Sequence, residues 1–176
     1  MLALGLGACG GQEAHRTDAG AENNGVYIQA GPITYQLAVS RVLNPYSTED
    51  SQYLTGLPAG AHGPKPDELW YGVFLWAKNQ SKHDASTAYI FVIEDTQGTR
   101  YYPIAVNSAV NRYAWTAQTL RPSATEPGPD TMASFGPTQG GLLLFKLNTS
   151  VYSNRPVTLY IYAPGESKPS TISLDL

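Results

Sequence analysis

Acidic residues come first among those that could do chemistry, because two carboxylates facing one cleft can hydrolyse a glycosidic bond. The chain has three adjacent pairs, Glu49-Asp50, Asp67-Glu68 and Glu94-Asp95. Adjacent side chains of a strand point to opposite faces of the sheet. Each pair is therefore interpreted more simply as a solvated turn or strand end. A hydrolase with a carboxylate pair hidden in its long loops stays open as one alternative function.

The histidines and serines do not form a recognisable catalytic or metal-binding pattern. His15, His62 and His83 are far apart and lack the spacing of metal ligands. The sequence contains no GxSxG or SxxK motif. We therefore expect no catalytic residues, no metal site and no cofactor, and the sequence does not predict an enzyme.

The single cysteine, Cys9, follows a short apolar segment, residues 2–8. One cysteine cannot form an internal disulfide. The stretch Leu6-Gly7-Ala8-Cys9 resembles a bacterial lipobox, in which the cysteine receives a diacylglyceryl group and the preceding signal is removed. Acyl chains hold a protein at a membrane with about 0.8 kcal/mol per buried CH₂. The resemblance implies lipidation of Cys9 and a lipid anchor on the extracytoplasmic side of the cell envelope.

The residues around Cys9 set two further expectations. No Lys or Arg precedes Cys9, and the apolar segment is short for a signal peptide. We expect residues 1–8 to be the remnant of a signal that begins upstream. The segment that follows, GGQEAHRTDAGAENNG, is polar and has no apolar period. Residues 9–25 are therefore expected to be the lipidated cysteine and a disordered, flexible tether.

Composition excludes some partners. The net charge is −3, and the 11 basic residues are scattered, so no basic surface for nucleic acid is expected. No apolar run reaches the roughly 20 residues of a transmembrane helix. Only 14% of the residues are charged, and Tyr, Gly and Pro are abundant, which favours strands and turns.

Strand patterns recur through residues 26–176 without a long amphipathic helix. Residues 33–42 alternate, with Ile33, Tyr35, Leu37 and Val39 on one face. Residues 68–79 are apolar on both faces, which is typical of a central strand. Further strands are expected at 85–94, 99–105, 142–147, 157–163 and 171–176. The pattern predicts an all-β domain, an immunoglobulin-like β-sandwich of about seven to nine strands.

Three motifs carry a further resemblance. They are Lys78-Asn79 at the end of the central strand, the turn from Asp95 to Gly98, and the glycine before the late strand in Gly141 to Phe145. In this order they resemble a family of uncharacterised extracellular lipoprotein domains. That family shares its immunoglobulin-like sandwich with secreted mycobacterial immunoprotective antigens. The resemblance covers residues 26–176 and implies no catalytic activity. The loops at 44–67 and 121–141 are longer than expected for the family.

Aromatic residues are the best candidates for binding. Trp70, Phe74 and Trp76 share one face of the central strand and are expected to fill the space between the sheets. Exposed Tyr, Trp and Arg side chains in loops form binding hot spots. The candidate binding residues in the long loops are Arg112, Tyr113, Trp115, Tyr46 and Tyr53. Packing of these rings against the sandwich is the simpler alternative.

The sequence thus predicts a membrane-anchored extracytoplasmic lipoprotein that presents a non-catalytic binding or structural domain. Residues 44–67 and 106–141 are its expected contact surface, because sandwich folds place recognition in loops. Another envelope protein or a cell-wall glycan is the expected partner. A carbohydrate- or cell-wall-binding module that uses Tyr113 and Trp115 is the alternative.

Overall fold

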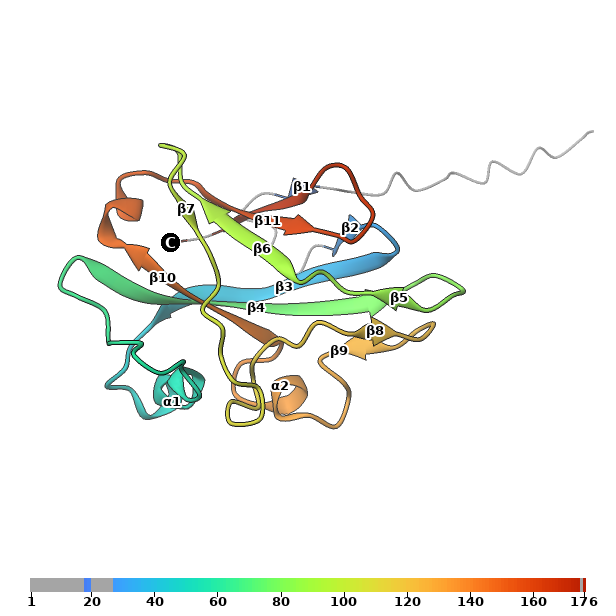
Figure 1. Ribbon diagram of the computed structural model, residues 1–176, viewed down its shortest axis with the longest axis horizontal. Helices are drawn as coiled ribbons and strands as arrows, with labels where there is room; N and C mark the ends of the chain where they lie inside the picture. The colour runs from blue at the N-terminus through green and yellow to red at the C-terminus, as the bar shows by residue number, and fades with distance from the viewer. Residues whose placement is uncertain (1–17, 20–26, 175) are drawn as a thin grey trace, which may run out of the picture.

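The computed structural model describes residues 18–19, 27–174 and 176, which form a β-sandwich of two main sheets (Figure 1). The first sheet has the order β1 (Asp18–Ala19), β12 (Ser170–Leu174), β11 (Val157–Tyr162), β6 (Ile90–Glu94), β7 (Arg100–Tyr101). The second has the order β10 (Gly141–Asn148), β4 (Glu68–Asn79), β3 (Ile33–Leu43), β2 (Tyr27–Ala30), and β9 (Thr125–Glu126) pairs with β4. A separate short ribbon joins β5 (Ala85–Ser86) and β8 (Thr119–Leu120).

The predicted fold class is confirmed. Within the described residues, seven strands have four or more residues and the others have two. In the described part of the chain, helical structure is limited to four short turns: α1 (Thr48–Ser51), η2 (Gln52–Leu54), α2 (Met132–Phe135) and η3 (Thr149–Tyr152). No described helix is long and apolar enough to cross a bilayer. β1 lies within the segment expected to be a tether, yet it pairs in parallel with Thr171 and Ile172 of β12.

Two predicted strands are interrupted. Residues 85–94 divide into β5, which pairs with β8, and β6, which pairs with β11. The Thr87 N–H donates to the Gln118 carbonyl at 2.9 Å and continues the pairing with β8. The expected strand at 99–105 is reduced to the two residues of β7. Beyond β7, the Ile104 N–H donates to the Leu144 carbonyl at 2.7 Å, so the chain crosses from the first sheet to the second.

The main hydrophobic core lies between the two sheets. β4 contributes Tyr71, Val73 and Leu75 to it, and the facing sheet contributes side chains such as Leu159 and Ile161. All five side chains are 0% exposed. Burial of alternate residues in this layer is the period-2 pattern that identified the strands in the sequence.

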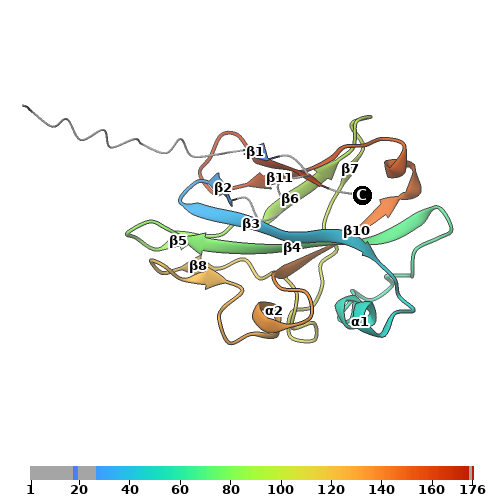
Figure 2. The ribbon, with the colours of Figure 1, turned by 180° about the vertical axis from the view of Figure 1, so that it is seen from behind.

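A second hydrophobic core lies on the other face of β4 and not between the sheets, which corrects the expected position of Trp70 and Phe74. These side chains pack with Leu43, Leu142 and Leu144, and with Tyr53, Tyr113 and Ala133 from the long loops. Figure 2 shows α1 and α2 on this side of the second sheet, away from the first sheet. The long loops therefore form a third layer, the loop layer, and β4 is buried on both faces because of it.

A β-bulge in β3 changes which side chains face each core. The pairing with β4 shifts between Leu37 and Val39. Ile33, Tyr35 and Leu37 face the main core, whereas Val39 packs against the second core, contrary to the simple alternation expected. An extra residue in a strand moves every later side chain to the opposite face. The bulge thereby directs Arg41 toward the long loop that follows β3.

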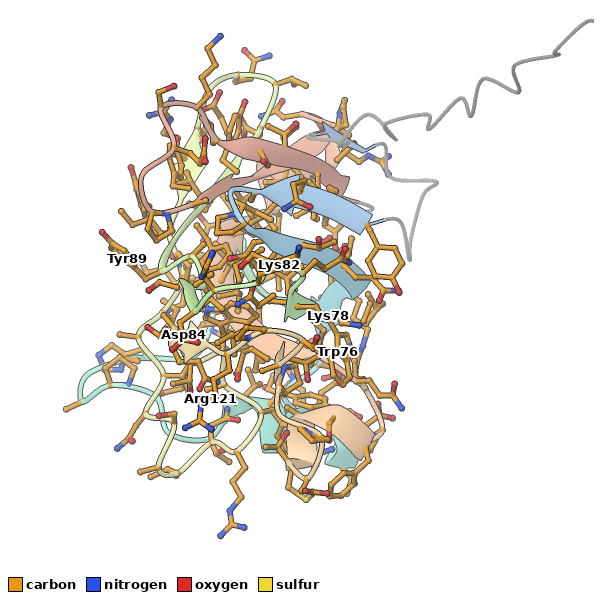
Figure 3. All side chains as sticks on the ribbon, turned by 90° about the vertical axis from the view of Figure 1, so that its right-hand side faces the viewer. Trp76, Lys78, Lys82, Asp84, Tyr89 and Arg121 are labelled. Carbon is orange, nitrogen blue, oxygen red and sulfur yellow. The ribbon has the colours of Figure 1, made fainter. Side chains whose placement is uncertain are left out.

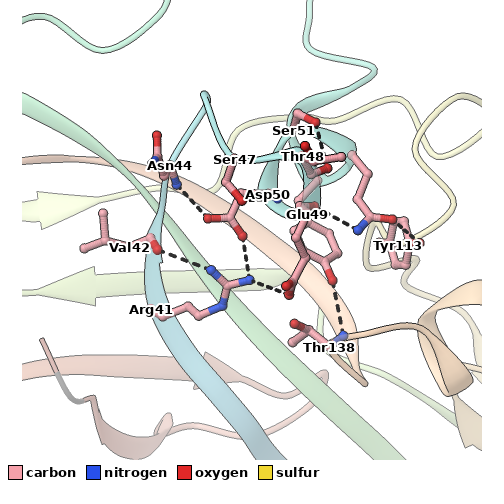
Figure 4. A network of polar contacts seen from close by, with 12 residues as sticks. Arg41, Val42, Asn44, Ser47, Thr48, Glu49, Asp50, Ser51, Tyr113 and Thr138 are labelled. Carbon is pink, nitrogen blue, oxygen red and sulfur yellow. Dashed lines mark hydrogen bonds and ion pairs between the residues drawn. The ribbon is translucent and has the colours of Figure 1, made fainter.

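An ion-pair network fixes that loop to the sheet (Figure 4). The Arg41 guanidinium donates to Asp50 at 2.6 Å and lies 3.3 Å from Glu49, both in α1. The Asn44 N–H also donates to Asp50 at 2.8 Å. Burial alone would raise the pKa of Asp50, but the hydrogen bonds from Arg41 and Asn44 outweigh it and hold that pKa below its usual value. The network holds α1 over the second core.

Candidate functional site

One surface hollow lies at the side of the sandwich, where the chain between β7 and β8 runs beside β10. The Trp115 N–H donates to the Leu142 carbonyl at 2.8 Å, and the Leu142 N–H donates to the Tyr113 carbonyl at 2.7 Å. The Ile104 N–H bonds farther along the same strand edge, at Leu144. Between these two attachments the surface is hollowed, with Leu142–Leu144 at its floor.

Two adjoining hollows, of about 310 and 320 Å³, share Tyr89 and Ala117 and form one elongated depression, the side groove. Tyr89 is 68% exposed and stands between the two hollows. Figure 3 shows Tyr89 projecting outward at one end of the domain. Its ring is therefore available to a ligand.

Trp115 is the second aromatic residue of the side groove, and its position is fixed. Its indole N–H donates to the Ala88 carbonyl at 3.2 Å, and its ring packs edge-on against Phe91 with centroids 5.6 Å apart. A Cβ on Gly141 would lie 2.9 Å from the Trp115 ring, so only glycine lets the indole approach β10 this closely. The Ala88 N–H donates to the Tyr35 hydroxyl at 2.6 Å, and burial raises the pKa of Tyr35 to about 12. That phenol stays neutral and structural.

The side groove is lined by aromatic rings, aliphatic side chains, hydroxyls and one amide. Its polar side chains besides Tyr89 are Ser86, Thr87, Gln118 and Thr119, and no described residue in its lining is charged at neutral pH. Such a surface can stack against a ligand and exchange hydrogen bonds with it. It is suited to an uncharged, elongated ligand.

A smaller hollow of about 190 Å³ lies behind the side groove, and we name it the acid pocket. Residues 112–119 form the wall between the two. Trp115, Ala117 and Thr119 line only the side groove, whereas Arg112 and Thr116 line only the acid pocket. Glu126 of β9, only 6% exposed, lies in the acid pocket. Burial raises the pKa of Glu126, and hydrogen bonds from the Gln118 side chain and the Thr116 N–H only partly offset this rise.

A third hollow, of about 500 Å³, lies where β3 ends and β4 begins. Tyr46, Pro45, Val42 and Trp70 line it, and Tyr46 is 95% exposed. The Lys146 ammonium lies 4.8 Å from the centre of the Trp70 ring, and Lys146 donates to the His62 carbonyl at 2.8 Å. These contacts fix the loop beside the hollow.

The structure separates the five candidate binding residues. Tyr53 (0% exposed) and Tyr113 (6% exposed) are buried, so they do not belong to an exposed contact surface. Their rings pack edge-on with centroids 4.8 Å apart, and the Tyr113 hydroxyl donates to Gln52 at 2.5 Å. Tyr46 and Arg112 are exposed, and Trp115 is half-buried in the side groove. Cys9 lies outside the described residues.

Sequence reasoning missed Tyr89 and Glu126. Tyr89 falls inside residues 85–94, which were expected to form one continuous strand, and the break after β5 exposes it. Glu126 lies in a Pro- and Gly-rich segment, where an acidic residue is normally solvated. Only the pairing of Ala77 with Glu126 brings this carboxylate under the loop layer.

At least one member of each acidic pair named in the sequence makes other contacts. Glu49 and Asp50 bind Arg41, Glu94 binds Arg100 at 2.6 Å, and Glu68 lies 3.9 Å from Lys146. The Asp95 carboxylate accepts the N–H groups of Gln97 and Thr99 within its own turn, both at 2.9 Å. No group of three or more His, Cys, Asp or Glu side chains suited to a metal occurs among the described residues.

Comparison with known proteins identifies the fold. No protein-family model matches the chain. No curated protein matches its sequence. The crystal structure of the yjhA protein from Bacillus subtilis matches with a TM-score of 0.56 and 14% identity, over 92% of this chain and 100% of that one. That of ycdA from Bacillus subtilis, described as a candidate lipoprotein, matches with a TM-score of 0.50 and 11% identity, over 85% of this chain and 38% of that one.

A third structure, an uncharacterised β-sandwich protein from Clostridium difficile, matches with a TM-score of 0.47 and 12% identity, over 93% of this chain and 99% of that one. At these identities the similarity to yjhA and ycdA shows a shared fold alone. The resemblance to mycobacterial antigens stays a prediction.

Proposed function

We propose that this protein is a non-catalytic binding domain of the cell envelope, which is anchored by lipid at Cys9 and contacts its ligand through the side groove. The observation that carries the binding role is Tyr89, a 68% exposed ring between two uncharged hollows. The lipobox-like stretch before Cys9 supports the anchor. The description of ycdA, a protein of similar fold, as a candidate lipoprotein agrees with it.

A glycan is the ligand class that the side groove favours among the expected partners. Sugar rings present apolar faces that stack on aromatic side chains and hydroxyls that exchange hydrogen bonds with Ser, Thr and Gln. Trp115 and Tyr89 supply the aromatic surface, and the exposed side chains of Ser86, Gln118 and Thr119 the polar one. The loop contact surface expected at 44–67 is a weaker candidate, because Tyr53 and Asp50 in it are buried.

Sedimentation tests the binding role. The full chain carrying Cys9→Ser is mixed with isolated cell-wall material and with insoluble neutral polysaccharides, and the pelleted fraction is measured. Tyr89→Ala should abolish sedimentation. Tyr152→Ala, which truncates another exposed tyrosine that lines none of the four hollows, should preserve it. Equal sedimentation of both variants would refute the side groove as the contact surface.

Mass spectrometry of the mature protein from a membrane fraction tests the anchor separately. A diacylglyceryl mass on Cys9 is the expected result. An unmodified Cys9 would remove the anchor from the proposal without affecting the binding role.

A further inference from the structure

Glu126 is a buried carboxylate without a cationic partner among the described residues. Its side chain accepts hydrogen bonds from the Gln118 amide and the Thr116 N–H, which are both neutral. Buried charges are normally paired with an opposite charge, because desolvation of a lone ion is costly. The neutral donors satisfy its hydrogen bonding but do not compensate its charge.

The structure describes two other buried acidic residues, Asp50 and Asp95, and their surroundings differ from those of Glu126. Asp50 (5% exposed) is paired with Arg41 at 2.6 Å. Asp95 (4% exposed) accepts two N–H groups of its own turn and the Asn154 amide at 3.3 Å, and it does not line any of the hollows described above. Glu126 differs from both because it lines a hollow.

A residue of opposite charge, Arg112, also lines this hollow. Arg112 lines the acid pocket and is exposed, and it forms no ion pair or hydrogen bond with a described residue. Asn111 and Thr131 in the lining already bond to backbone groups. The two uncompensated groups of the acid pocket are therefore one buried anion and one cation closer to solvent.

We propose that the acid pocket binds a small zwitterion, an α-amino acid. The ammonium group would pair with Glu126 and the carboxylate with the Arg112 guanidinium, which is suited to bidentate contact with a carboxylate. The volume of about 190 Å³ is below the range of roughly 300–1,000 Å³ for drug-sized ligands, which favours a small side chain. The acid pocket shares Ala114 and Gln118 with the side groove, but neither Glu126 nor Arg112 lines the side groove.

Calorimetric titration of the full chain carrying Cys9→Ser tests the proposal with glycine and with both enantiomers of alanine. Ethylamine and propionate are the control probes, because each carries only one of the two charges. Alanine or glycine should bind, and each control probe should bind at least about tenfold more weakly, because it loses one charge-assisted contact. Phenylalanine should bind more weakly than alanine because of its volume.

Two variants identify the site. Glu126→Gln and Arg112→Gln should each weaken amino-acid binding about tenfold or more. Arg121→Gln is the matched control, since Arg121 is exposed and does not line the acid pocket. If Glu126→Gln does not fold, Arg112→Gln still tests whether the acid pocket binds the amino acid, because Arg112 is at an exposed position.

Three results would overturn the proposal: no heat with any amino acid, binding that neither variant changes, or binding of the amine and the carboxylate as tight as that of alanine. Because none of these measurements uses the side groove, they leave the sedimentation test of the proposed function unaffected.

Discussion

The two faces of β4 are buried in different ways. The inner face packs Tyr71, Val73 and Leu75 against the opposite sheet, and strands supply its neighbours. The outer face packs Trp70 and Phe74 against side chains of the long loops, including Tyr53 and Tyr113. The comparison shows that some side chains of the long loops belong to the second hydrophobic core. Their exposed remainder forms the walls of the side groove and of the acid pocket.

The largest effect should come from truncating one large side chain in each core. Phe145→Ala in the main core and Phe74→Ala in the second core should each lower the free energy of unfolding by about 3–5 kcal/mol. Urea denaturation followed by tryptophan fluorescence measures both. Similar losses with one cooperative transition would show that the loop layer folds with the sandwich. A loss below about 1 kcal/mol for Phe74→Ala would show that the loop layer contributes little to stability.

A smaller effect should follow from breaking the network that holds α1 over the second core. Asp50→Asn should cost about 2 kcal/mol at pH 7, because hydrogen bonds to charged groups contribute roughly 1.5–3 kcal/mol. Glu49→Gln, whose side chain is 51% exposed in its contact with Arg41, is the control and should change stability much less.

The same residue should govern stability in acid. The pKa of Asp50 is lowered in the folded protein, so its contribution is present above the unfolded value of about 3.9 and is lost as pH falls through the folded pKa. The difference between the wild-type protein and Asp50→Asn should therefore shrink below about pH 4. A difference that stays constant down to the folded pKa would contradict this origin.

Glu126 should make the free energy of unfolding depend on pH in the opposite direction. Its pKa is raised on folding, so the folded state binds a proton more tightly and stability falls as pH rises from the unfolded value of about 4.3 through the folded pKa. Glu126→Gln should remove this fall. Unfolding midpoints of both proteins between pH 4 and pH 8 test it, and parallel curves would contradict it.

The smallest effect should come from Tyr89→Ala. An exposed ring contributes little to packing, so the free energy of unfolding should change by about 0.5 kcal/mol or less. Tyr53→Ala, at a buried position of the same residue type, should cost several times as much. Thermal unfolding of both variants tests the pair, and equal losses would show that Tyr89 is also part of the packed structure.

The strands of the main core could be predicted from the sequence. The range expected for the central strand, 68–79, coincides with β4, and apolar patterns located β3, β10, β11 and β12 within a few positions. β4 and β10 are continuous apolar runs because both of their faces are buried, whereas β11 and β12 alternate with period 2 because one face is buried.

The sites could be predicted less well. Tyr53 lies in a Pro- and Gly-rich loop and Tyr113 in a segment without a clear strand pattern, where a tyrosine is expected to be exposed, yet both are buried. The sequence places Tyr89 within an expected strand, yet its side chain is exposed. No local pattern distinguishes these cases, since each depends on a partner far along the chain: Tyr53 packs on Phe74, and Thr87 beside Tyr89 bonds to Gln118.

The sequence by itself determined the all-β class, the central position of β4 and the division between strands and long loops, because these follow from short-range periodicity and from Pro and Gly. Only the tertiary structure decided which loop side chains are buried and which charges are brought together. The bulge in β3 directs Arg41 to Asp50, and the pairing of β9 with β4 buries Glu126 near Arg112. Both depend on contacts between distant segments, which form only when the chain is folded.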